Sequence, residues 1–222
     1  MAYAFDFSAV LEYREALLAG TGRTLMLTGI GAVAGLVLGT AGAVSRAWRL
    51  APFDRIFAVY VELIRNTPFL VQLFFIFFGL PSLGVQMDEW QAAILAVVIN
   101  LGAYSTEIIR AGIEATPRGQ IEAAQSLAMT RRQIFFHVVL PPALAKVWPA
   151  ICSQVVIVML GTSVCSQIAA EELTFAANFI QSRNFRAFET YFVVTAMYFL
   201  LAVGVRQVLA LTGQRLLGRR SK

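Results

Sequence analysis

Polar and charged side chains interrupt several long apolar stretches of this sequence, and they are its clearest candidates for binding chemistry. They are Glu62, Arg65, Asn66, Thr67, Gln72, Asn100, Tyr104, Glu107, Gln154, Thr162 and Ser163. A charge at membrane depth costs roughly 2.5–3.5 kcal/mol, so such groups usually face a cavity or a partner. Glu62 and Arg65 can also pair with each other on one helix, which leaves both a ligand site and a structural ion pair open. Glu107 and Arg110 repeat the spacing, and there we expect a structural pair.

The sequence shows no pattern typical of catalysis or of nucleotide binding. Its glycine-rich run, 29–42, has no lysine and therefore does not form the phosphate-binding motif G-x-x-x-x-G-K-[ST]. The single histidine, His137, and the scattered acids show neither metal-ligand spacing nor a nucleophile–base pair. We therefore expect no enzyme activity, no metal and no cofactor on this chain, and we place His137 in a loop.

Composition indicates a membrane protein. Of the 222 residues, 58% are hydrophobic and only 14% are charged, with a mean hydropathy of +0.69, whereas a water-soluble domain carries far more charge. Crossing a bilayer takes about 20 apolar residues. Five stretches reach that length, at about 24–44, 56–80, 90–109, 147–168 and 190–211. We predict an all-α membrane protein with five transmembrane helices and a single domain over 1–222.

Lysine and arginine are distributed unevenly between the connections, which predicts the orientation. The segments 45–55, 110–146 and 206–222 hold thirteen of the 18 Lys and Arg residues. With the N-terminus outside and the C-terminus in the cytosol, the outer side holds only Arg14, Arg23, Arg183 and Arg186. The net charge of +5 thus reflects topology, and we expect contact with membrane lipid but no nucleic-acid partner.

Two features accompany the first predicted span. Gly31, Gly35 and Gly39 recur at four-residue spacing, which allows two helices to approach closely. We expect this row to pack within one subunit rather than form a dimer seam. Before the span, residues 7–18 mix apolar side chains with charged ones and predict an amphipathic helix lying at the outer interface.

Pro68 lies inside the second predicted span. Proline removes a backbone donor and disfavours helical geometry at the preceding residue, Thr67. The carbonyl groups freed in this way need water or a ligand, which is tolerable only beside a cavity. The sequence therefore predicts a broken helix next to Arg65.

A charged, helix-prone segment separates the third and fourth spans, in the predicted cytosolic loop 114–141. Pro117 suits the start of a helix, and Ile121, Ala124 and Leu127 share one helical face. The small residues around them offer little apolar area to hold the helix in lipid. We therefore expect it to dock against a protein partner rather than lie on the membrane.

The loop also resembles a known motif. Glu122-Ala123-Ala124, three residues, Ala128, nine residues and then Val138-Val139-Leu140-Pro141 resemble the EAA loop of ATP-binding cassette (ABC) importer permeases, which reads EAA, three residues, Gly, nine residues, Ile-x-Leu-Pro. Ala128 replaces the usual Gly, which we expect to stiffen the turn, and Val138 replaces Ile.

Other segments resemble the polar amino acid branch of the same permeases, the histidine/glutamine/arginine type. The segment 65–73, RNTPFLVQL, is similar to that branch's RGTPLLVQL, with Asn66 in place of Gly. Further matches lie at 103–104, 107–108, 110–113 and 117–120. The resemblance covers most of the chain from about residue 20 to 215 and implies the type I ABC importer permease fold in a bacterial inner membrane.

The resemblance also implies partners and roles. It implies two cytosolic ATPase subunits that hold ATP and magnesium, a second permease that is identical or paralogous, and a periplasmic binding protein that delivers a polar amino acid. The loop would form a coupling helix in a groove of the ATPase. Its docking residues would be Glu122, Ala123, Ala124, Ser126, Leu127, Ala128 and Arg131.

Transporters commonly bind substrate at discontinuous helices near the midplane, so we place the substrate beside the predicted break. Arg65 would meet the carboxylate of the amino acid, and Gln154, Thr162 or Glu62 would meet its ammonium group. The remaining site candidates are Asn66, Thr67, Gln72, Tyr104 and Ser163. A channel or a membrane scaffold is the alternative reading, and neither would need an ATPase at the loop. Which amino acid is carried is left open by the sequence.

Overall fold

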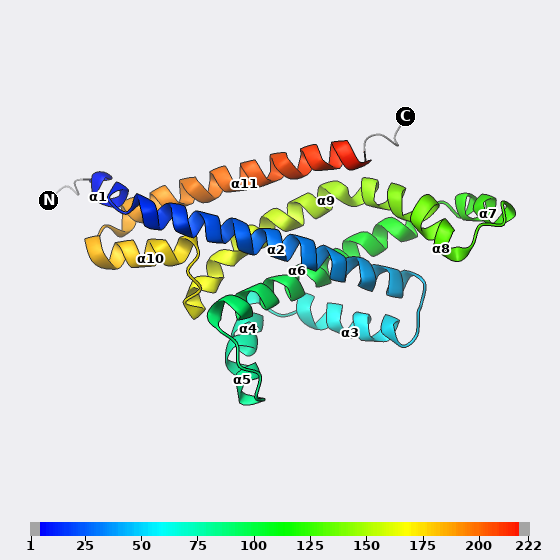
Figure 1. Cartoon of the computed structure of the whole chain (residues 1–222), viewed down its shortest axis with the longest axis horizontal. Helices are drawn as coiled ribbons and strands as arrows, with labels where there is room; N and C mark the ends of the chain where they lie inside the picture. The colour runs from blue at the N-terminus through cyan, green and yellow to red at the C-terminus, as the bar shows by residue number, and fades with distance from the viewer. Residues whose placement is uncertain (1–4, 218–222) are drawn as a thin grey trace.

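Four long helices form the body of the molecule. The computed structural model describes residues 5–217, so both ends of the predicted domain 1–222 lie outside the described residues. Within this range the chain is helical and forms no strand, which confirms the all-α class. The long helices run along the long axis of the molecule (Figure 1). They are α2 (Arg14–Ala47), α6 (Glu89–Glu114), α9 (Leu140–Gly161) and α11 (Ala187–Leu217).

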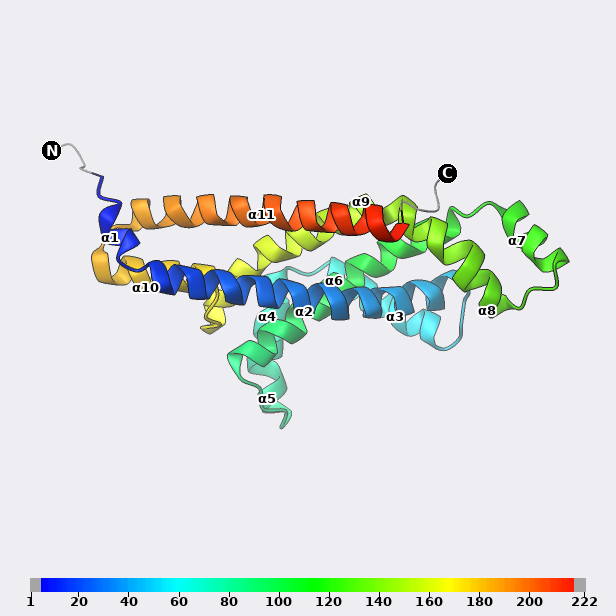
Figure 2. The ribbon, with the colours of Figure 1, turned by 45° about the horizontal axis from the view of Figure 1, so that its top comes forward.

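Shorter elements occupy the two ends of this body. At one end lie α1 (Ser8–Leu11) and α10 (Leu173–Asn184), which follows the 3-10 turn η3 (Thr162–Ile168). At the opposite end lie α7 (Arg118–Ser126) and α8 (Arg131–Ile134), as Figure 2 shows. The π-helical turn η2 (Phe135–Val139) joins α8 to α9. His137 therefore lies in a helical turn rather than in the loop that we expected.

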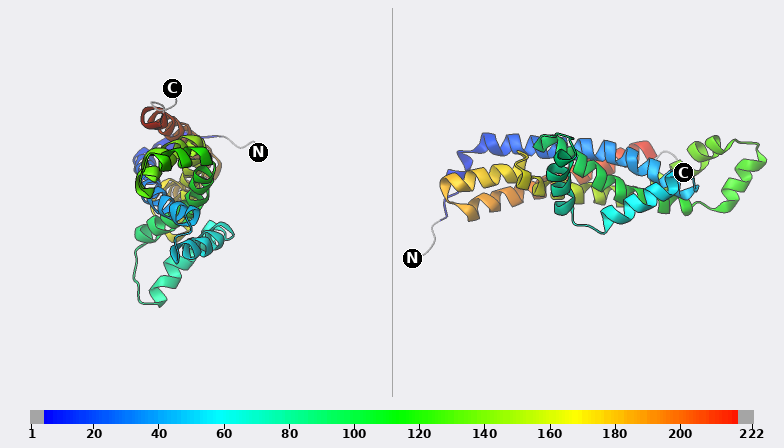
Figure 3. Two further views of the ribbon diagram at one scale, coloured as in Figure 1. Left: turned by 90° about the vertical axis from the view of Figure 1, so that its right-hand side faces the viewer. Right: turned by 90° about the horizontal axis from the view of Figure 1, so that it is seen from below.

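A third group of elements projects sideways. It consists of α3 (Phe53–Arg65), α4 (Phe69–Phe74), the π-helical turn η1 (Phe75–Gly79) and α5 (Leu80–Ser82). Viewed along the long axis of the molecule, these elements lie outside the ring formed by the other helices (Figure 3, left).

In the described part of the chain, the candidate membrane spans number four, or five when one bent helix pair is counted as a single span. Among the described residues, four helical stretches are long and apolar enough to cross a bilayer. They are Arg14–Ala47, Glu89–Glu114, Arg131–Ile168 and Ala187–Arg215. The pair Phe53–Arg65 and Phe69–Ser82 passes the same test only when taken together, and its halves are bent by 112°. Counted as one span, this pair is the fifth candidate, and it corresponds to the predicted span 56–80 with its expected break at Pro68.

The amphipathic helix predicted over 7–18 is divided in the structure. Helix α1 ends at Leu11, a turn follows, and α2 begins at Arg14. The turn lets α1 pack across α10, where Asn184 Nδ2 donates to the carbonyl oxygen of Ala9 at 3.4 Å. Val10 and Leu17 are both buried in the cluster formed with α10. Tertiary packing therefore overrides the continuous helical pattern of this segment.

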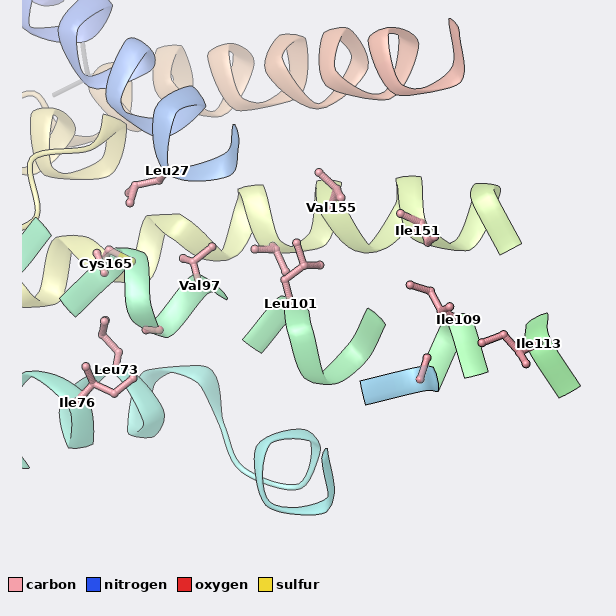
Figure 4. Close-up of a cluster of buried hydrophobic side chains, with 14 of the residues drawn as sticks. Leu27, Leu73, Ile76, Val97, Leu101, Ile109, Ile113, Ile151, Val155 and Cys165 are labelled. Carbon is pink, nitrogen blue, oxygen red and sulfur yellow. The ribbon is translucent and has the colours of Figure 1, made fainter. Parts of the chain in front are cut away.

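Helix α6 lies at the centre of the apolar core. It contacts α2, α3, α4, α9 and η3, and its Val97, Leu101 and Ile109 are almost fully buried. Figure 4 shows these side chains together with Ile151 and Val155 of α9. An Asp88–Gln91 capping box fixes the start of α6 by hydrogen bonds in both directions.

The predicted glycine row forms the contact between α2 and α6 within one subunit. A methyl group added at Gly39 would lie 2.5 Å from the Cβ of Ser105 and 3.0 Å from the carbonyl oxygen of Gly102. Gly35 faces Leu101 in the same way, and Gly31 faces Val97. Only glycine permits this approach of two helices, where packing replaces the hydrophobic drive that lipid does not supply.

We predict that Gly39→Ala destabilises the subunit, because the added methyl group overpacks a helix contact, which typically costs about 1–3 kcal/mol. The midpoint of thermal unfolding in detergent should fall by several degrees. Gly29→Ala is the matched control, because Gly29 lies on the same helix with open space around it and alanine favours a helix. Equal midpoints for the two variants would contradict the role of the row.

Candidate functional site

The second span breaks at Pro68, as the sequence predicted. Helix α3 ends at Arg65, Asn66 caps it, and Pro68 adopts an extended backbone with φ −64° and ψ 140° before α4 begins. Because proline has no N–H, the carbonyl oxygen of Ile64, four residues before Pro68, loses its helical donor. It must find another partner within the membrane.

Gln72 supplies this partner from within the protein. Its side-chain Nε2 donates to the carbonyl oxygen of Ile64 at 2.7 Å and lies 2.9 Å from the carbonyl oxygen of Thr67 and from Thr67 Oγ1. Its Oε1 accepts from Asn100 Nδ2 of α6 at 3.0 Å. Gln72 is buried. The structure thus places this predicted site residue as a brace that ties both halves of the span to α6.

The polar residues before the break form a local network. Asn66 Nδ2 donates to Glu62 Oε1 at 3.0 Å and to the carbonyl oxygen of Glu62 at 2.8 Å. Thr67 Oγ1 donates to the carbonyl oxygen of Leu63 at 2.8 Å. Glu62, Asn66 and Thr67 are all exposed in the isolated subunit. They lie on one face of the break, next to Arg65.

Arg65 pairs with an acid on another helix, whereas one of the two possibilities left open by the sequence was a pair with Glu62. Among the described residues, its guanidinium faces Glu107 of α6, with Nη1 3.9 Å from Oε2, and not Glu62. It also lies over the ring of Tyr104, with Cζ 5.5 Å from the centroid, in cation–π geometry. The Glu62–Arg65 ion pair, which the sequence left open as one alternative, does not form among the described residues. The cause is that α3 packs against α6, which offers Arg65 a carboxylate and a ring from a neighbouring helix.

Glu107 forms ion pairs with three arginines of the described chain, of which the sequence predicted only one. The expected pair with Arg110 is present, with Nη2 2.8 Å from Oε2. Arg46 at the end of α2 also forms an ion pair with Glu107. Arg110 forms a second ion pair, with Glu114. Three guanidinium groups thus converge on one carboxylate. In the sequence, Arg46 was used only to predict the orientation. Its pairing could have been suggested by Glu107, an acid near the end of another predicted span on the same side of the membrane.

Three other predicted site residues lie on α9 and η3. Thr162 is fully buried, and its hydroxyl donates to the carbonyl oxygen of Met159 at 2.6 Å. The hydroxyl of Ser163 donates to the carbonyl oxygen of Leu160 at 2.7 Å. Both hydroxyls thereby serve the transition from α9 into η3. Gln154 is half-buried on α9. The structure therefore brings together the α3 break and Tyr104, while Thr162 is turned into the protein.

Helix α7 carries most of the predicted docking residues on an exposed face. Glu122, Ala123 and Ser126 are exposed, and Leu127 is 77% exposed. Ala124 is the exception, because it is only 4% exposed and belongs to the same core cluster as Ile134. Its side chain holds α7 against the rest of this subunit, which corrects its placement at a partner surface.

The turn after α7 shows how alanine is accommodated at position 128, where the EAA motif usually has glycine. Ala128 adopts a left-handed backbone, with φ 57°. Its N–H donates to the carbonyl oxygen of Gln125 at 2.9 Å, and that of Met129 donates to the carbonyl oxygen of Ala124 at 3.3 Å. These two bonds form a Schellman motif, whose left-handed position is usually glycine. Alanine there costs roughly 1 kcal/mol, so the bonds of the turn outweigh the strain. Arg131 follows on α8.

Solved structures share this fold. A chain of an amino acid ABC transporter crystallised with histidines matches with a TM-score of 0.86 and 34% identity over 96% of this chain and all of that chain. The MetNI methionine ABC transporter, in an inward-facing conformation, matches with a TM-score of 0.72 at 21% identity over 93% of this chain and 97% of that chain. The second likeness shows the fold alone.

Known sequences agree with this likeness. The glutamine transport system permease protein GlnP of Escherichia coli (strain K12) is 32% identical over 90% of this chain and 92% of its own. The L-cystine transport system permease protein TcyB of Bacillus subtilis (strain 168) is 38% identical over 72% of this chain and 69% of its own. The family described as binding-protein-dependent transport system inner membrane component matches residues 17–218. The chain, with its broken second span and its exposed helix α7, therefore belongs to this family of inner membrane transport components.

Proposed function

We propose that this chain is the permease subunit of an ABC importer, which takes a polar amino acid from a periplasmic binding protein and moves it into the cytosol by alternating access. The observation that carries the proposal is α7, a helix with an exposed face at one end of the bundle, which packs on its own subunit through the buried Ala124 and ends in the Schellman turn. A separate ATPase would hold ATP and magnesium. The relatives named for glutamine and L-cystine support an amino acid as the substrate.

The substrate carboxylate meets Arg65 in this proposal. Arg65 is the loosest of the three arginines at Glu107, with a separation of 3.9 Å against 2.8 Å for Arg110, and its side chain is 43% exposed. Arg65 can therefore release Glu107 and bind the substrate carboxylate, because Arg46 and Arg110 still pair with Glu107. Arg65 and Tyr104 provide a planar fork and a ring face beside the break. Glu62, one turn earlier, is the acid available to the ammonium group.

Assembly completes the site in this proposal. Glu62, Asn66 and Thr67 are exposed at the break, and α3, α4 and α5 lie outside the ring of the other helices (Figure 3, left). A second permease, identical or paralogous, covers the break, and each permease docks one ATPase at α7. The positive-inside distribution of Lys and Arg supports the placement of α7 in the cytosol and of α1 and α10 outside.

Arg65→Ala should abolish uptake while assembly and basal ATP hydrolysis persist, because it removes the partner of the substrate carboxylate. Arg65→Lys should also impair uptake, since lysine keeps the charge but lacks the planar fork. Uptake and ATP hydrolysis are measured in proteoliposomes, with Glu62→Gln as a neighbouring comparison. Loss of the folded complex in Arg65→Ala would show that the contact with Glu107 is structural instead.

Glu122→Lys and Ala123→Leu should weaken docking of the ATPase, because both residues lie on the exposed face of α7. Substrate-stimulated hydrolysis and uptake should fall together, and less ATPase should co-purify. Ala124→Leu is the contrast: it overpacks the contact of α7 with its own subunit and should lower thermal stability of the permease even without ATPase. Normal coupling in both exposed-face variants would favour a channel or scaffold over an importer.

A topology test addresses orientation. Ser82 ends α5 and is exposed, so Ser82→Cys should react with a membrane-impermeant thiol reagent added from the periplasm. A reporter fused after Lys222 should be active only in the cytosol. Labelling of position 82 from the cytosol would overturn the proposed orientation.

A further inference from the structure

A large groove lies at the α7 end of the molecule, away from the broken span. Its volume is about 1110 Å³, slightly above the usual range of small-molecule sites. One wall is the C-terminal part of α2 with the turn after it, and the other is the segment from α8 to the start of α9. Both walls belong to stretches that qualify as membrane spans or adjoin them.

The groove combines apolar walls with two arginines. Its apolar lining includes Val37, Val44 and Phe136, of which Val37 is 67% exposed and Phe136 50% exposed. Arg131 and Arg132 complete the lining from the start of α8. Within residues 5–217, neither arginine forms an ion pair with an acidic residue; Arg132 lies 6.0 Å from the ring centroid of Phe136.

An aromatic residue marks the level of the groove in the membrane. Trp48 lines the groove where α2 ends, is 37% exposed, and meets the buried ring of Phe135 edge-on with centroids 4.8 Å apart. Tryptophan is enriched at the boundary between lipid tails and headgroups. Trp48 and the two arginines thus place the polar end of the groove at the headgroup level and its apolar length among the acyl chains.

We propose that this groove binds an anionic phospholipid of the cytosolic leaflet. The phosphate lies against Arg131 and Arg132, whose planar guanidinium groups suit phosphate oxygens, and the acyl chains lie along α2. Basic pockets between helices on the cytosolic side are recognised by anionic headgroups. The inference rests on the proposed function only for the assignment of this end to the cytosol.

Charge favours a lipid over a protein segment as the occupant. Two exposed guanidinium groups without an acidic partner in the described residues attract an anion. A transmembrane helix of a second permease would have to bring acids to this level to do the same. An anionic lipid supplies the charge and the apolar length in one molecule. Its headgroup would also lie next to Ile121 and Gln125 of α7, which line the same groove. The lipid would therefore join the end of α2 to the docking helix.

The test measures lipid retention on the intact complex of permease and ATPase by native mass spectrometry. Delipidated complex is titrated with phosphatidylglycerol and, separately, with phosphatidylcholine. Wild type should retain phosphatidylglycerol selectively. The double variant Arg131→Gln, Arg132→Gln should bind it roughly tenfold more weakly or worse, because each basic residue near the headgroup contributes to attraction. Binding of phosphatidylcholine should not change.

Two further variants keep the test specific. Arg55→Gln, Arg206→Gln removes two exposed arginines of the predicted cytosolic segments that do not line the groove and should leave lipid retention unchanged. Ala41→Trp fills the groove at α2 and should lower retention while both arginines remain. Lipid is compared only between complexes of the same subunit composition, so that any loss of ATPase is counted separately.

Three outcomes would overturn the proposal. The first is equal retention of phosphatidylglycerol in wild type and in Arg131→Gln, Arg132→Gln. The second is a loss in Arg55→Gln, Arg206→Gln as large as in that variant. The third is efficient cross-linking of Ala41→Cys to a second permease. Substrate-stimulated ATP hydrolysis is measured on the same samples. Selective retention of phosphatidylglycerol without substrate-stimulated ATP hydrolysis would support the lipid site and overturn the proposed function. Substrate-stimulated hydrolysis without selective retention would support the proposed function and overturn the lipid site.

Discussion

The close approach of α2 and α6 is the contact on which the other elements depend. Lipid tails are as apolar as the side chains of the helices, so no hydrophobic force drives helices together within the bilayer, and dispersion contacts must do so. The glycine row supplies them by bringing two backbones together along several turns. Since α6 also contacts α3, α4, α9 and η3, the position of α6 determines where the broken span and the core of α9 lie.

The same helix organises the charges. Glu107 extends from α6 toward the ends of α2 and α3, and it gathers Arg46, Arg65 and Arg110. A half-buried acid with several arginines tolerates the loss of one contact, because the others keep it paired. Packing through glycine joins α2 to α6, and pairing through Glu107 connects the same two helices to α3. A substrate that draws Arg65 away would alter a contact between α3 and α6 without breaking the rest of the network.

Sequence reasoning succeeded where one residue dictates local geometry and failed where a neighbouring helix decides. Pro68 cannot donate, so the break was predictable, and the glycine row can only serve close contact. The partner of Arg65 was not predictable, since helical spacing offered Glu62 while α6 offered Glu107. Ala124 and Gln72 were misjudged for a related reason: their types suit a binding surface, but burial within the subunit uses their side chains. The turn at residues 12–13 similarly depends on α10, which lies far away in the sequence.

The exposed residues at the broken span bear on how subunits would associate. An isolated copy exposes Asn66, Thr67 and part of the Arg65 side chain at the break, and polar groups that face lipid are unfavourable. If a second permease covers the break, as proposed, these residues leave the lipid when the two subunits meet. The polar break would then favour the assembled pair over the solitary subunit, in addition to any role in binding a solute.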